Sequence, residues 1–322
     1  MITYIHRNVG AGYSINKVTQ TIIRDITNKE EFYAPTYHNS LIDVIKNILF
    51  VWKNRNKVNY NHITGGLHYG VIGLIGCKSV LTIHDTAMVD YFKCSWIKRV
   101  LMEWLWFKIP LKLVGKIVCI SENTKNSIKK YTNRTDIKVI YNAVDPSFTP
   151  YLKEFNISKP NILIIGTAPN KNLEKTFESL SGFSCHLTII GKLDQQQLDL
   201  LREYQLDYTN KINLSDEEIK KEYEDADIVS FVSKFEGFGM PIIEANSIGR
   251  PVVCSNIPVL KEIGGNSVLY VEPNDVDDIR RGFDEIVKNA NLREQLIANG
   301  FENAKRFSQE AILKQWLDLY KD

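Results

Sequence analysis

The sequence predicts an α/β protein built from two doubly wound domains of similar size. Short apolar runs alternate with amphipathic stretches of helix length along almost the whole chain, which is typical of parallel sheets covered by helices. The alternation stops over residues 145–160, where prolines at 146, 150 and 160 indicate a linker. A chain of 322 residues is long enough to form a hydrophobic core on each side of that linker.

The predicted strands are short runs rich in Ile and Val, and the predicted helices have apolar residues three and four positions apart. In the first half we expect strands at 2–6, 62–64, 80–84, 117–120 and 137–141, and helices at 14–26, 40–51, 96–107 and 122–131. In the second half we expect strands at 162–165, 186–190, 208–212, 228–232, 252–255 and 268–271, with helices between them. The tail over 291–320 is predicted to be helical throughout.

The composition excludes several classes of protein. Charged residues make up 24% of the chain and hydrophobic residues 44%, which is typical of a globular protein. A net charge of +2 is too small for a general nucleic-acid binder. There is no apolar run of about 18 residues and no signal-peptide pattern, so we expect a cytoplasmic protein without a membrane-spanning helix. The cysteines are scattered, which favours free thiols over a zinc site: Cys77, Cys94, Cys119, Cys185 and Cys254.

The segment 235–244, FEGFGMPIIE, is the most informative stretch of the chain. An apolar run precedes it, and Gly237 to Gly239 form a small-residue turn before a predicted helix. A strand that ends in such a turn directs several backbone N–H groups toward one place, where an anion such as a diphosphate can bind. Glu236 stands at the turn and Glu244 two helical turns later. The alternative is an ordinary strand-to-helix turn.

Further motifs extend this prediction along the chain. Before the linker they are GAG at 10–12, TIHD at 82–85, ISE at 120–122 and VIYNAVD at 139–145; after it they are IIGT at 164–167, KNL at 171–173, ADI at 226–228, the Glu pair and GRPVV at 249–253. In the order and spacing of these motifs, the chain resembles the retaining, nucleotide-sugar-dependent glycosyltransferases of family 4. The resemblance implies the GT-B fold, in which two Rossmann-like domains face each other across a cleft. It further implies an acceptor-binding domain at 1–150, a nucleotide-sugar-binding domain at 151–305, and a C-terminal helix at 306–322 that packs back toward the first domain.

The resemblance also implies roles for residues of the second domain. Glu236 would contact the donor sugar, where a carboxylate stabilises positive charge at the anomeric carbon. Glu244 would accept hydrogen bonds from the ribose, and Lys171 would hold the departing diphosphate. The alternatives are a solvated loop glutamate, a carboxylate favoured by the helix dipole, and a surface lysine. The diphosphate would meet the backbone N–H groups of Gly237, Phe238, Gly239 and Met240.

Other predicted contacts are less specific. An Arg often follows the strand-end glycine in the family, but this chain has Thr167 there, so Lys171 acts alone or with a cation from elsewhere. The loop at Leu214 is predicted to hold the base, although Ser215 and Glu218 form a capping box that could explain it. In the first domain we expect His84 to contact the sugar or the reacting face. Gly10 and Gly12 would let a ligand approach the backbone. The alternatives are a structural histidine and a plain turn.

Together these features predict a hexosyltransferase-type enzyme (EC 2.4) that transfers a sugar with retention to an acceptor hydroxyl. The donor would be a UDP- or GDP-sugar, with no other cofactor and no metal, because the DAD at 225–227 falls where a helix runs into a strand. The acceptor would be a glycan or lipid-linked glycan in bacterial surface polysaccharide synthesis, such as lipopolysaccharide, O-antigen or capsule. Two alternatives are a nucleotide-sugar 2-epimerase and a non-catalytic sugar-nucleotide-binding protein or membrane scaffold.

The segment 93–116 carries a separate hypothesis about location. It contains three tryptophans, many aliphatic residues and several Lys and Arg residues against a single Glu. A basic amphipathic helix with aromatic residues can lie on an anionic membrane, so we expect peripheral contact with the cytoplasmic face of the inner membrane. The alternative is a core-facing helix with an ordinary basic outer face.

Overall fold

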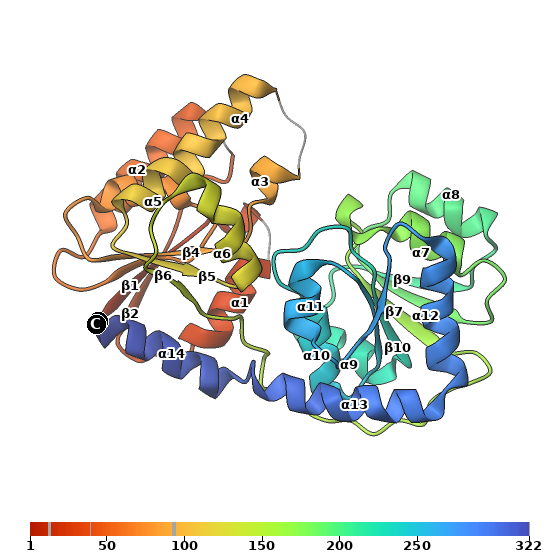
Figure 1. The fold of residues 1–322 in the computed structure, drawn as a ribbon. Helices are drawn as coiled ribbons and strands as arrows, with labels where there is room; N and C mark the ends of the chain where they lie inside the picture. Colours follow the sequence, from red (N-terminus) through yellow and green to blue (C-terminus); the bar gives the residue numbers. More distant parts are fainter. Residues whose placement is uncertain (12–13, 39, 92–94, 322) are drawn as a thin grey trace. The chain divides into compact units, whose positions relative to one another are not determined.

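The computed structural model describes residues 1–11, 14–38, 40–91 and 95–321. Its contacts divide the chain into two compact units, drawn in Figure 1. Unit 1 comprises residues 1–143 and 309–322, and unit 2 comprises residues 144–308. The sequence predicted the division at 150, but the linker already belongs to unit 2. Within that unit, the Val144 N–H donates to the carbonyl of Phe307, and the Phe148 ring packs edge-on against Tyr223.

Unit 1 contains a six-stranded parallel sheet in the order β2-β1-β3-β4-β5-β6. The strands are β1 (Ile2–His6), β2 (Lys29–Tyr33), β3 (Asn61–Ile63), β4 (Ser79–Ile83), β5 (Lys116–Cys119) and β6 (Ile137–Val139). The α-helices are α1 (Ser14–Ile23), α2 (Leu41–Asn54), α3 (Ala87–Asp90), α4 (Trp96–Met102), α5 (Ile109–Leu113), α6 (Glu122–Ile128) and α14 (Gln309–Lys321). Shorter turns are the 3-10 helices η1 (Val9–Ala11), η2 (His68–Leu74) and η4 (Lys129–Tyr131), and the π-helical stretch η3 (Glu103–Lys108).

Unit 2 repeats the design with the order β12-β11-β10-β7-β8-β9, again all parallel. The strands are β7 (Asn161–Ile165), β8 (His186–Ile190), β9 (Tyr208–Lys211), β10 (Ile228–Phe231), β11 (Val252–Ser255) and β12 (Leu269–Val271). The helices are α7 (Leu173–Ser179), α8 (Gln195–Glu203), α9 (Asp216–Asp225), α10 (Met240–Ile248), α11 (Pro258–Gly264), α12 (Val276–Lys288) and α13 (Ala290–Lys305), with the 3-10 turn η5 (Pro169–Lys171).

Alternating strand residues build the cores on the two faces of the unit 1 sheet. Leu81 and Ile83 of β4 belong to one apolar cluster, and Val80 of the same strand belongs to another. The second cluster includes Trp316 and Leu319 of α14, which packs beside α1 on that face. The last helix therefore completes the core of the first unit.

The unit 2 strands have the continuous apolar character of parallel sheets that are covered on both faces. Their main cluster joins the sheet to residues of α7, α8 and α12, including Phe177, Leu201 and Phe283. These helices hold the strands rigidly, so the loops that follow the strands start from fixed points.

Three elements differ from the sequence predictions. Strand β2 was missed because its sequence, KEEFY, is charged, and charged residues are common on an edge strand such as this one. The predicted helix at 96–107 runs to Leu113 and contains the π-helical stretch η3. The tail is not helical throughout, because α13 ends at Lys305 and α14 begins at Gln309, where the chain passes from unit 2 to unit 1.

Candidate functional site

The loop after β7 brings Lys171 to the carboxyl edge of the unit 2 sheet. Gly166 ends the strand with a φ of 89°, and a Cβ at that position would lie 2.9 Å from Lys171 Cε. Only glycine therefore allows the lysine side chain to lie across the strand end. Asn172 takes the left-handed conformation before α7, and its side-chain amide donates to the carbonyl of Pro273 at 2.7 Å. These two residues fix the course of the loop.

Lys171 forms an ion pair with Glu236. Its Nζ lies 2.7 Å from Glu236 Oε1, and Asn170 Nδ2 donates to the carbonyl of Phe235 at 2.9 Å. The two charged side chains are only 19% and 15% exposed, so their interaction is less screened than that of a surface pair. The structure therefore brings together two of the residues that the sequence predicted as catalytic.

This pair occupies a particular place in the sheet topology. Lys171 follows β7 and Glu236 follows β10, and these neighbouring strands flank the point at which the strand order reverses. Open α/β sheets bind ligands outside the carboxyl ends of the strands at such a switch point. The ion pair therefore lies at the edge where such sheets bind their ligands.

The glycine turn leads into α10 as the sequence predicts. Gly239 caps the helix with a φ of 129°, and Met240 is its first residue. The Phe238 side chain is buried and packs edge-on against Phe307, with ring centroids 5.8 Å apart. Because that side chain is committed to the core, Phe238 could meet a ligand only through its backbone.

Glu244 lies further along α10 and is half-buried. Its Oε2 accepts a hydrogen bond of 2.5 Å from the hydroxyl of Tyr223, which belongs to α9. Burial and the neighbouring carboxylate raise the pKa of Tyr223 well above its usual value, so the phenol stays protonated and donates. The sequence analysis missed Tyr223, since its pairing with Glu244 depends on the packing of two helices.

Two weaker predictions for unit 2 have different outcomes. Thr167 uses its hydroxyl to donate to the carbonyl of Lys192 at 2.7 Å, so in this structure it holds the neighbouring loop. Leu214 is half-buried in the loop before α9, where the predicted capping box of Ser215 and Glu218 is confirmed. No contact between Leu214 and the ion pair is seen among the described residues.

Arg250, the other cation considered for unit 2, makes contacts with the backbone. Its guanidinium is buried and donates to the backbone carbonyls of Tyr151, Tyr223 and Glu224. These contacts lie where α9 ends and β11 begins, away from the carboxyl ends of the strands. Arg250 therefore holds the framework of unit 2.

Buried polar atoms mark the same edge of the unit 2 sheet. Asn172 Oδ1, Ser233 Oγ and Ser255 Oγ have no hydrogen-bond partner within the described part of the chain. They stand at or just beyond the carboxyl ends of β7, β10 and β11. Buried polar atoms normally find a partner in protein, water or ligand, which indicates that this edge is built to meet a polar molecule. Neither Ser233 nor Ser255 was predicted, because only the order of the strands brings them to one edge of the sheet.

His84 occupies the corresponding edge of unit 1. It follows β4, and its Nε2 lies 2.8 Å from the carbonyl oxygen of Thr64, which follows β3. Because a carbonyl only accepts, Nε2 carries the proton and Nδ1 remains an acceptor. Burial lowers the pKa of His84 to about 4, and the bond to Thr64 opposes this only in part. The imidazole is therefore neutral at pH 7.

Several residues around His84 were not predicted. Thr64 Oγ1 lies 3.1 Å from Nδ1 of the buried His6, and His6 Nε2 lies 3.3 Å from Glu31 Oε2. Asp85, next to His84, is half-buried, and the partial loss of water around its carboxyl raises its pKa, while the guanidinium of Arg7 acts in the opposite direction. Arg7 follows β1, so the strand ends of unit 1 bring basic, acidic and imidazole groups together.

Gly10 lies in η1 and is exposed. Its N–H donates to Asn8 Oδ1 at 2.8 Å, and the ring of Tyr37 closes over its Cα. These contacts explain a glycine at this turn without a ligand. Gly12, the other predicted glycine of this loop, lies outside the described residues.

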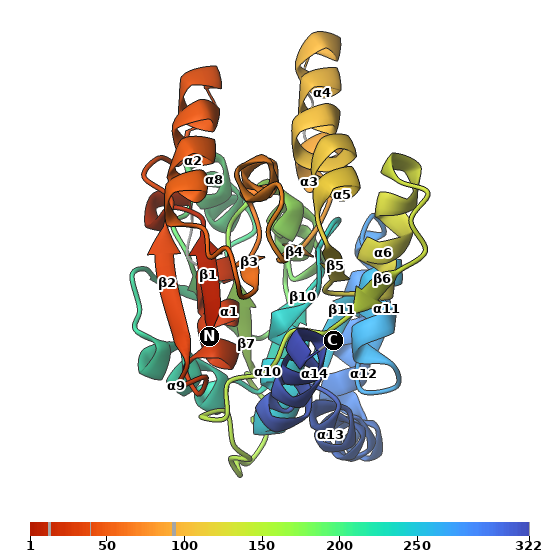
Figure 2. The ribbon, with the colours of Figure 1, turned by 90° about the vertical axis from the view of Figure 1, so that its left-hand side faces the viewer.

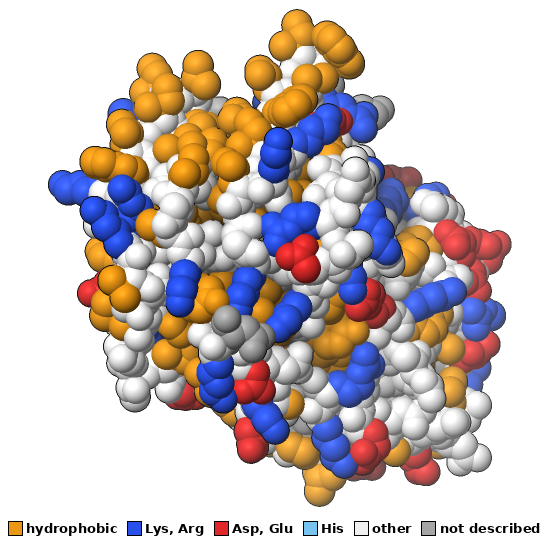
Figure 3. Space-filling model, turned by 60° about the vertical axis from the view of Figure 1, so that its left-hand side comes forward, with side chains coloured by type: hydrophobic (Ala, Val, Ile, Leu, Met, Phe, Trp, Pro, Cys, Tyr) orange, Lys and Arg blue, Asp and Glu red, His pale blue; other side chains and the backbone are white. Residues whose placement is uncertain are grey.

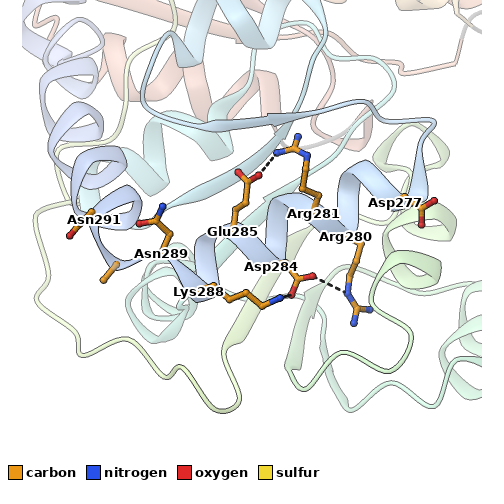
Figure 4. Close-up of a pocket in the computed structure, with 9 residues that line it drawn as sticks. Asp277, Arg280, Arg281, Asp284, Glu285, Lys288, Asn289 and Asn291 are labelled. Carbon is orange, nitrogen blue, oxygen red and sulfur yellow. Dashed lines mark hydrogen bonds and ion pairs between the residues drawn. The ribbon is translucent and has the colours of Figure 1, made fainter.

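Unit 2 also has a hollow that is separate from this site. It has a volume of about 770 Å³ and lies over the outer face of α12 and the start of α13 (Figure 4). Its charged side chains pair with one another along the helix: Arg281 with Glu285 at 2.9 Å and Lys288 with Asp284 at 2.9 Å. Such pairs four residues apart are ordinary surface features, and none of the predicted site residues lines the hollow.

The described residues contain neither a cluster of metal ligands nor a helix that could span a membrane. Over residues 1–11, 14–38, 40–91 and 95–321, no group of three or more His, Cys, Asp or Glu side chains is placed to hold a metal ion. In the same ranges, every helix is too short or too polar to cross a bilayer.

The similarity to known families covers both halves of the chain. Residues 152–303 match the family described as glycosyl transferases group 1, and residues 28–148 match the glycosyltransferase family 4. The chain belongs to these family 4, group 1 glycosyltransferases. O-antigen chain mannosyltransferase B of Escherichia coli is 41% identical over 106 residues, or 33% of this chain and 28% of that protein. O-antigen chain mannosyltransferase RfbU of Salmonella typhimurium is 31% identical over 211 residues, which span 62% of this chain and 58% of that protein. The chain thus matches less than two thirds of the length of either relative.

Solved structures of other proteins have the same fold. Sucrose-phosphate synthase from Thermosynechococcus elongatus superposes with a TM-score of 0.83 at 16% identity, covering 100% of this chain and 98% of that one. HepE of Anabaena, solved with UDP and glucose, superposes with a TM-score of 0.81 at 13% identity, covering 100% and 99%. At such low identity the likeness shows the fold, which is GT-B, as the sequence analysis predicted.

Proposed function

We propose that this protein is a retaining glycosyltransferase that moves a sugar from a nucleoside diphosphate sugar to an acceptor hydroxyl. The observation that carries the proposal is the Lys171–Glu236 pair, 2.7 Å apart at the switch point of the unit 2 sheet and directly before the α10 turn. At this one edge of the sheet, the lysine and the start of α10 suit the negative phosphates of such a donor, and the carboxylate suits its sugar. Family membership supports the same reaction class.

In the proposed reaction the bond between the anomeric carbon and the diphosphate oxygen breaks. Negative charge then grows on the diphosphate, where the Lys171 ammonium and the backbone N–H groups at the start of α10 would stabilise it. Positive charge grows on the sugar ring, where the Glu236 carboxylate would stabilise it. Fixed charges in a half-buried site contribute to catalysis because they need little reorganisation as the reaction proceeds.

Binding of the donor would change the ion pair. A diphosphate oxygen would replace Glu236 Oε1 as the partner of Lys171 Nζ. Glu236 would then be available to the sugar hydroxyls while Asn170 still holds its loop. Before the donor binds, the ion pair would thus give each of the two charged side chains a partner of opposite charge.

The acceptor hydroxyl would attack from the side on which the diphosphate departs, so the anomeric configuration is kept. Its proton would pass to a phosphate oxygen of the leaving group, and the new bond would join the acceptor oxygen to the anomeric carbon. His84 is neutral and carries its proton on Nε2. It would therefore act as a hydrogen-bond acceptor for a sugar hydroxyl through Nδ1.

The names of the relatives suggest which substrates to test first. Two of them are O-antigen chain mannosyltransferases, and a structural neighbour was solved with UDP. We therefore propose a mannosyl donor carrying UDP or GDP and an acceptor in surface polysaccharide synthesis. The acceptor would be a glycan or lipid-linked glycan reached at the cytoplasmic face of the inner membrane.

A donor screen tests the proposal. UDP- and GDP-linked mannose, glucose, galactose and N-acetylglucosamine are compared by the shift in melting temperature and by release of free nucleotide in the presence of acceptor. One donor should raise the melting temperature and release nucleotide, and proton NMR should show the donor's anomeric configuration in the product. Inversion of configuration would reject the retaining mechanism. An isomerised nucleotide sugar without transfer would favour the epimerase, and binding without any turnover would favour the non-catalytic alternative.

A further inference from the structure

Helix α2 of unit 1 has two apolar faces. Val44 and Val51 are buried against the core, with Asn47 between them. On another side of the helix an apolar stripe is 50–66% exposed: Ile42, Ile45, Leu49 and Trp52. Their spacing of three and four residues places them on one face. A surface helix of a globular protein normally turns charged and polar residues outward, so this second stripe requires another explanation.

Helix α4 is more extreme, because none of its residues is buried. Trp96, Ile97 and Leu101 are 57–77% exposed, and Trp104 follows in η3 with half of its surface exposed. The continuation of the same helix is anchored instead, with Phe107 and Leu111 fully buried. The structure thus holds an apolar helical end away from the core of unit 1 on a rigid base.

The two exposed stripes stand on the same support. Both α2 and α5, which continues α4 through η3, pack against η2. Figures 1 and 2 show α2 and α4 projecting from the same end of unit 1. In the space-filling view of Figure 3, hydrophobic side chains cover two separate projections at that end, with Lys and Arg side chains below them. We call the exposed apolar residues of α2 and α4 named above the apolar tips.

The charges around the apolar tips are mostly positive. Lys46 and Lys53 flank the stripe of α2, and Lys98 and Arg99 share α4 with its exposed tryptophan. Two acidic residues lie near them: Asp43 in the first turn of α2, and Glu103, the first residue of η3. Glu103 is paired with Arg99 at 3.5 Å and Lys108 at 3.2 Å.

Cations also lie along the aromatic rings of the tips. The guanidinium of Arg55 is 4.7 Å from the ring centre of Trp52, and Lys108 Nζ is 5.1 Å from that of Trp104. An aromatic ring beside a cation suits an interface where one end is apolar and the other meets charged headgroups.

We propose that the two apolar tips insert into the interfacial region of an anionic lipid bilayer and so dock unit 1 on the membrane. Convex, separated projections fit a deformable bilayer, whereas a protein partner would need matching pockets. Exposed tryptophans and flanking lysines are the residues that prefer the interface of an anionic membrane. The α2 stripe had no part in the sequence-based hypothesis, which concerned 93–116 alone.

The proposal deepens the proposed function, since a lipid-linked acceptor would be met on that membrane. It can nevertheless be tested without turnover. The full chain is mixed with vesicles of pure phosphatidylcholine or of phosphatidylcholine with phosphatidylglycerol, and the bound fraction is measured by flotation. We expect binding to the anionic vesicles, weaker binding at high salt, and little binding to the neutral ones.

Substitutions at the tips sharpen the test. The double variants Ile45→Ser with Leu49→Ser, and Trp96→Ser with Ile97→Ser, should each lower the partition coefficient about tenfold or more, because each removes two large apolar side chains from the bilayer. The matched control is Leu152→Ser with Ile212→Ser in unit 2, two residues that are also more than half exposed. It should bind as the unchanged chain does. Circular dichroism and melting temperature should be the same for all three variants, since the side chains lie outside the core.

Three results would overturn the proposal: no binding to anionic vesicles, equal binding by tip variants and control, or loss in the tip variants of a dimer seen by sedimentation. The last result would assign the tips to a second copy of the chain. Turnover with a water-soluble acceptor distinguishes this proposal from the proposed function. Its absence in a chain that still binds vesicles would count against the transferase and not against docking.

Discussion

Units 1 and 2 share one sheet design but differ in what they place at the carboxyl edge. Unit 2 places a half-buried ion pair there, Lys171 with Glu236. Unit 1 places buried neutral imidazoles, with the pKa of His84 lowered to about 4. Fixed charges suit a part of the reaction in which charge develops, whereas neutral groups suit the recognition of hydroxyls. The same topology therefore supports two electrostatic environments.

The outer surfaces of the units differ as well. Among the described residues, seventeen large hydrophobic side chains are exposed in unit 1 and four in unit 2. The helices of unit 2 instead carry paired charges, as on α12. Unit 1 therefore has the surface that could meet an apolar partner, and unit 2 has the surface of an ordinary soluble domain.

The largest expected effect is loss of turnover on breaking the ion pair of unit 2. Lys171→Ala and Glu236→Gln should each lower the rate of nucleotide release about 100- to 1,000-fold, because each removes a group that would face charge in the transition state. Lys175→Ala on α7 is the matched control, since its ammonium pairs with Glu178 instead. A loss of less than about threefold in either site variant would remove that residue from the mechanism.

As the pH is lowered, unit 1 should unfold at a higher pH than unit 2. Burial lowers the pKa of His62 to about 3 and those of His68 and His84 to about 4. An unfolded imidazole has a pKa of about 6.5, so the unfolded chain binds more protons between these values and stability falls as the pH drops through that window. Each group with a folded pKa near 4 should cost about 2 kcal/mol at pH 5.

The tryptophans make the acid effect measurable in one unit. All five lie in unit 1, at positions 52, 96, 104, 106 and 316, whereas unit 2 has a single histidine, the partly exposed His186. Tryptophan fluorescence should therefore report unfolding at a higher pH than hydrogen exchange of unit 2 peptides. If both signals were lost at the same pH, the buried histidines would not make unit 1 less stable to acid than unit 2.

Two glycines should respond alike, because each makes room for a predicted site residue. A Cβ at Gly166 would meet Lys171 Cε at 2.9 Å, and one at Gly65 would meet His84 Cδ2 at 2.4 Å, both at positive φ. Gly166→Ala and Gly65→Ala should lower stability by about 1–2 kcal/mol from backbone strain and should also reduce donor binding. Gly182→Ala and Gly76→Ala also have positive φ but have no atom within 4 Å of the new methyl group. These controls should show the loss of stability without the loss of donor binding, as measured by denaturation and donor titration.

The smallest expected effect concerns Tyr223, which donates a hydrogen bond to Glu244. Tyr223→Phe removes the 2.5 Å hydrogen bond to that carboxylate. Because Glu244 is half-buried and water can partly replace the phenol, we expect the donor KM to rise roughly three- to tenfold, or about 1 kcal/mol, with kcat nearly unchanged. Tyr204→Phe, at the end of α8, is the control. An unchanged KM would show that the hydrogen bond does not orient Glu244 for the donor.

The repetitive parts of the fold could be predicted from the sequence. Eleven of the twelve strands were predicted, most of them as short Ile- and Val-rich runs, and β1, β8 and β11 match the predicted bounds. The missed strand β2 has the charged sequence KEEFY and owes its extended form to pairing with β1. The turn before α10 was predictable because Gly237, Gly239 and Pro241 impose local conformations that need no distant partner.

Local conformation and the type of chemistry could be read from short segments of the chain. Glycine turns, helix starts and the residues Lys171 and Glu236 follow from chemistry that a short segment carries with it. The packing of the folded chain determines which groups meet. It set Lys171 against Glu236, 65 positions apart, paired Tyr223 with Glu244, committed Arg250 to backbone carbonyls, and left the α2 stripe uncovered. The physical reason is that strand order and helix packing choose the neighbours of a side chain, and no short stretch of sequence contains that choice.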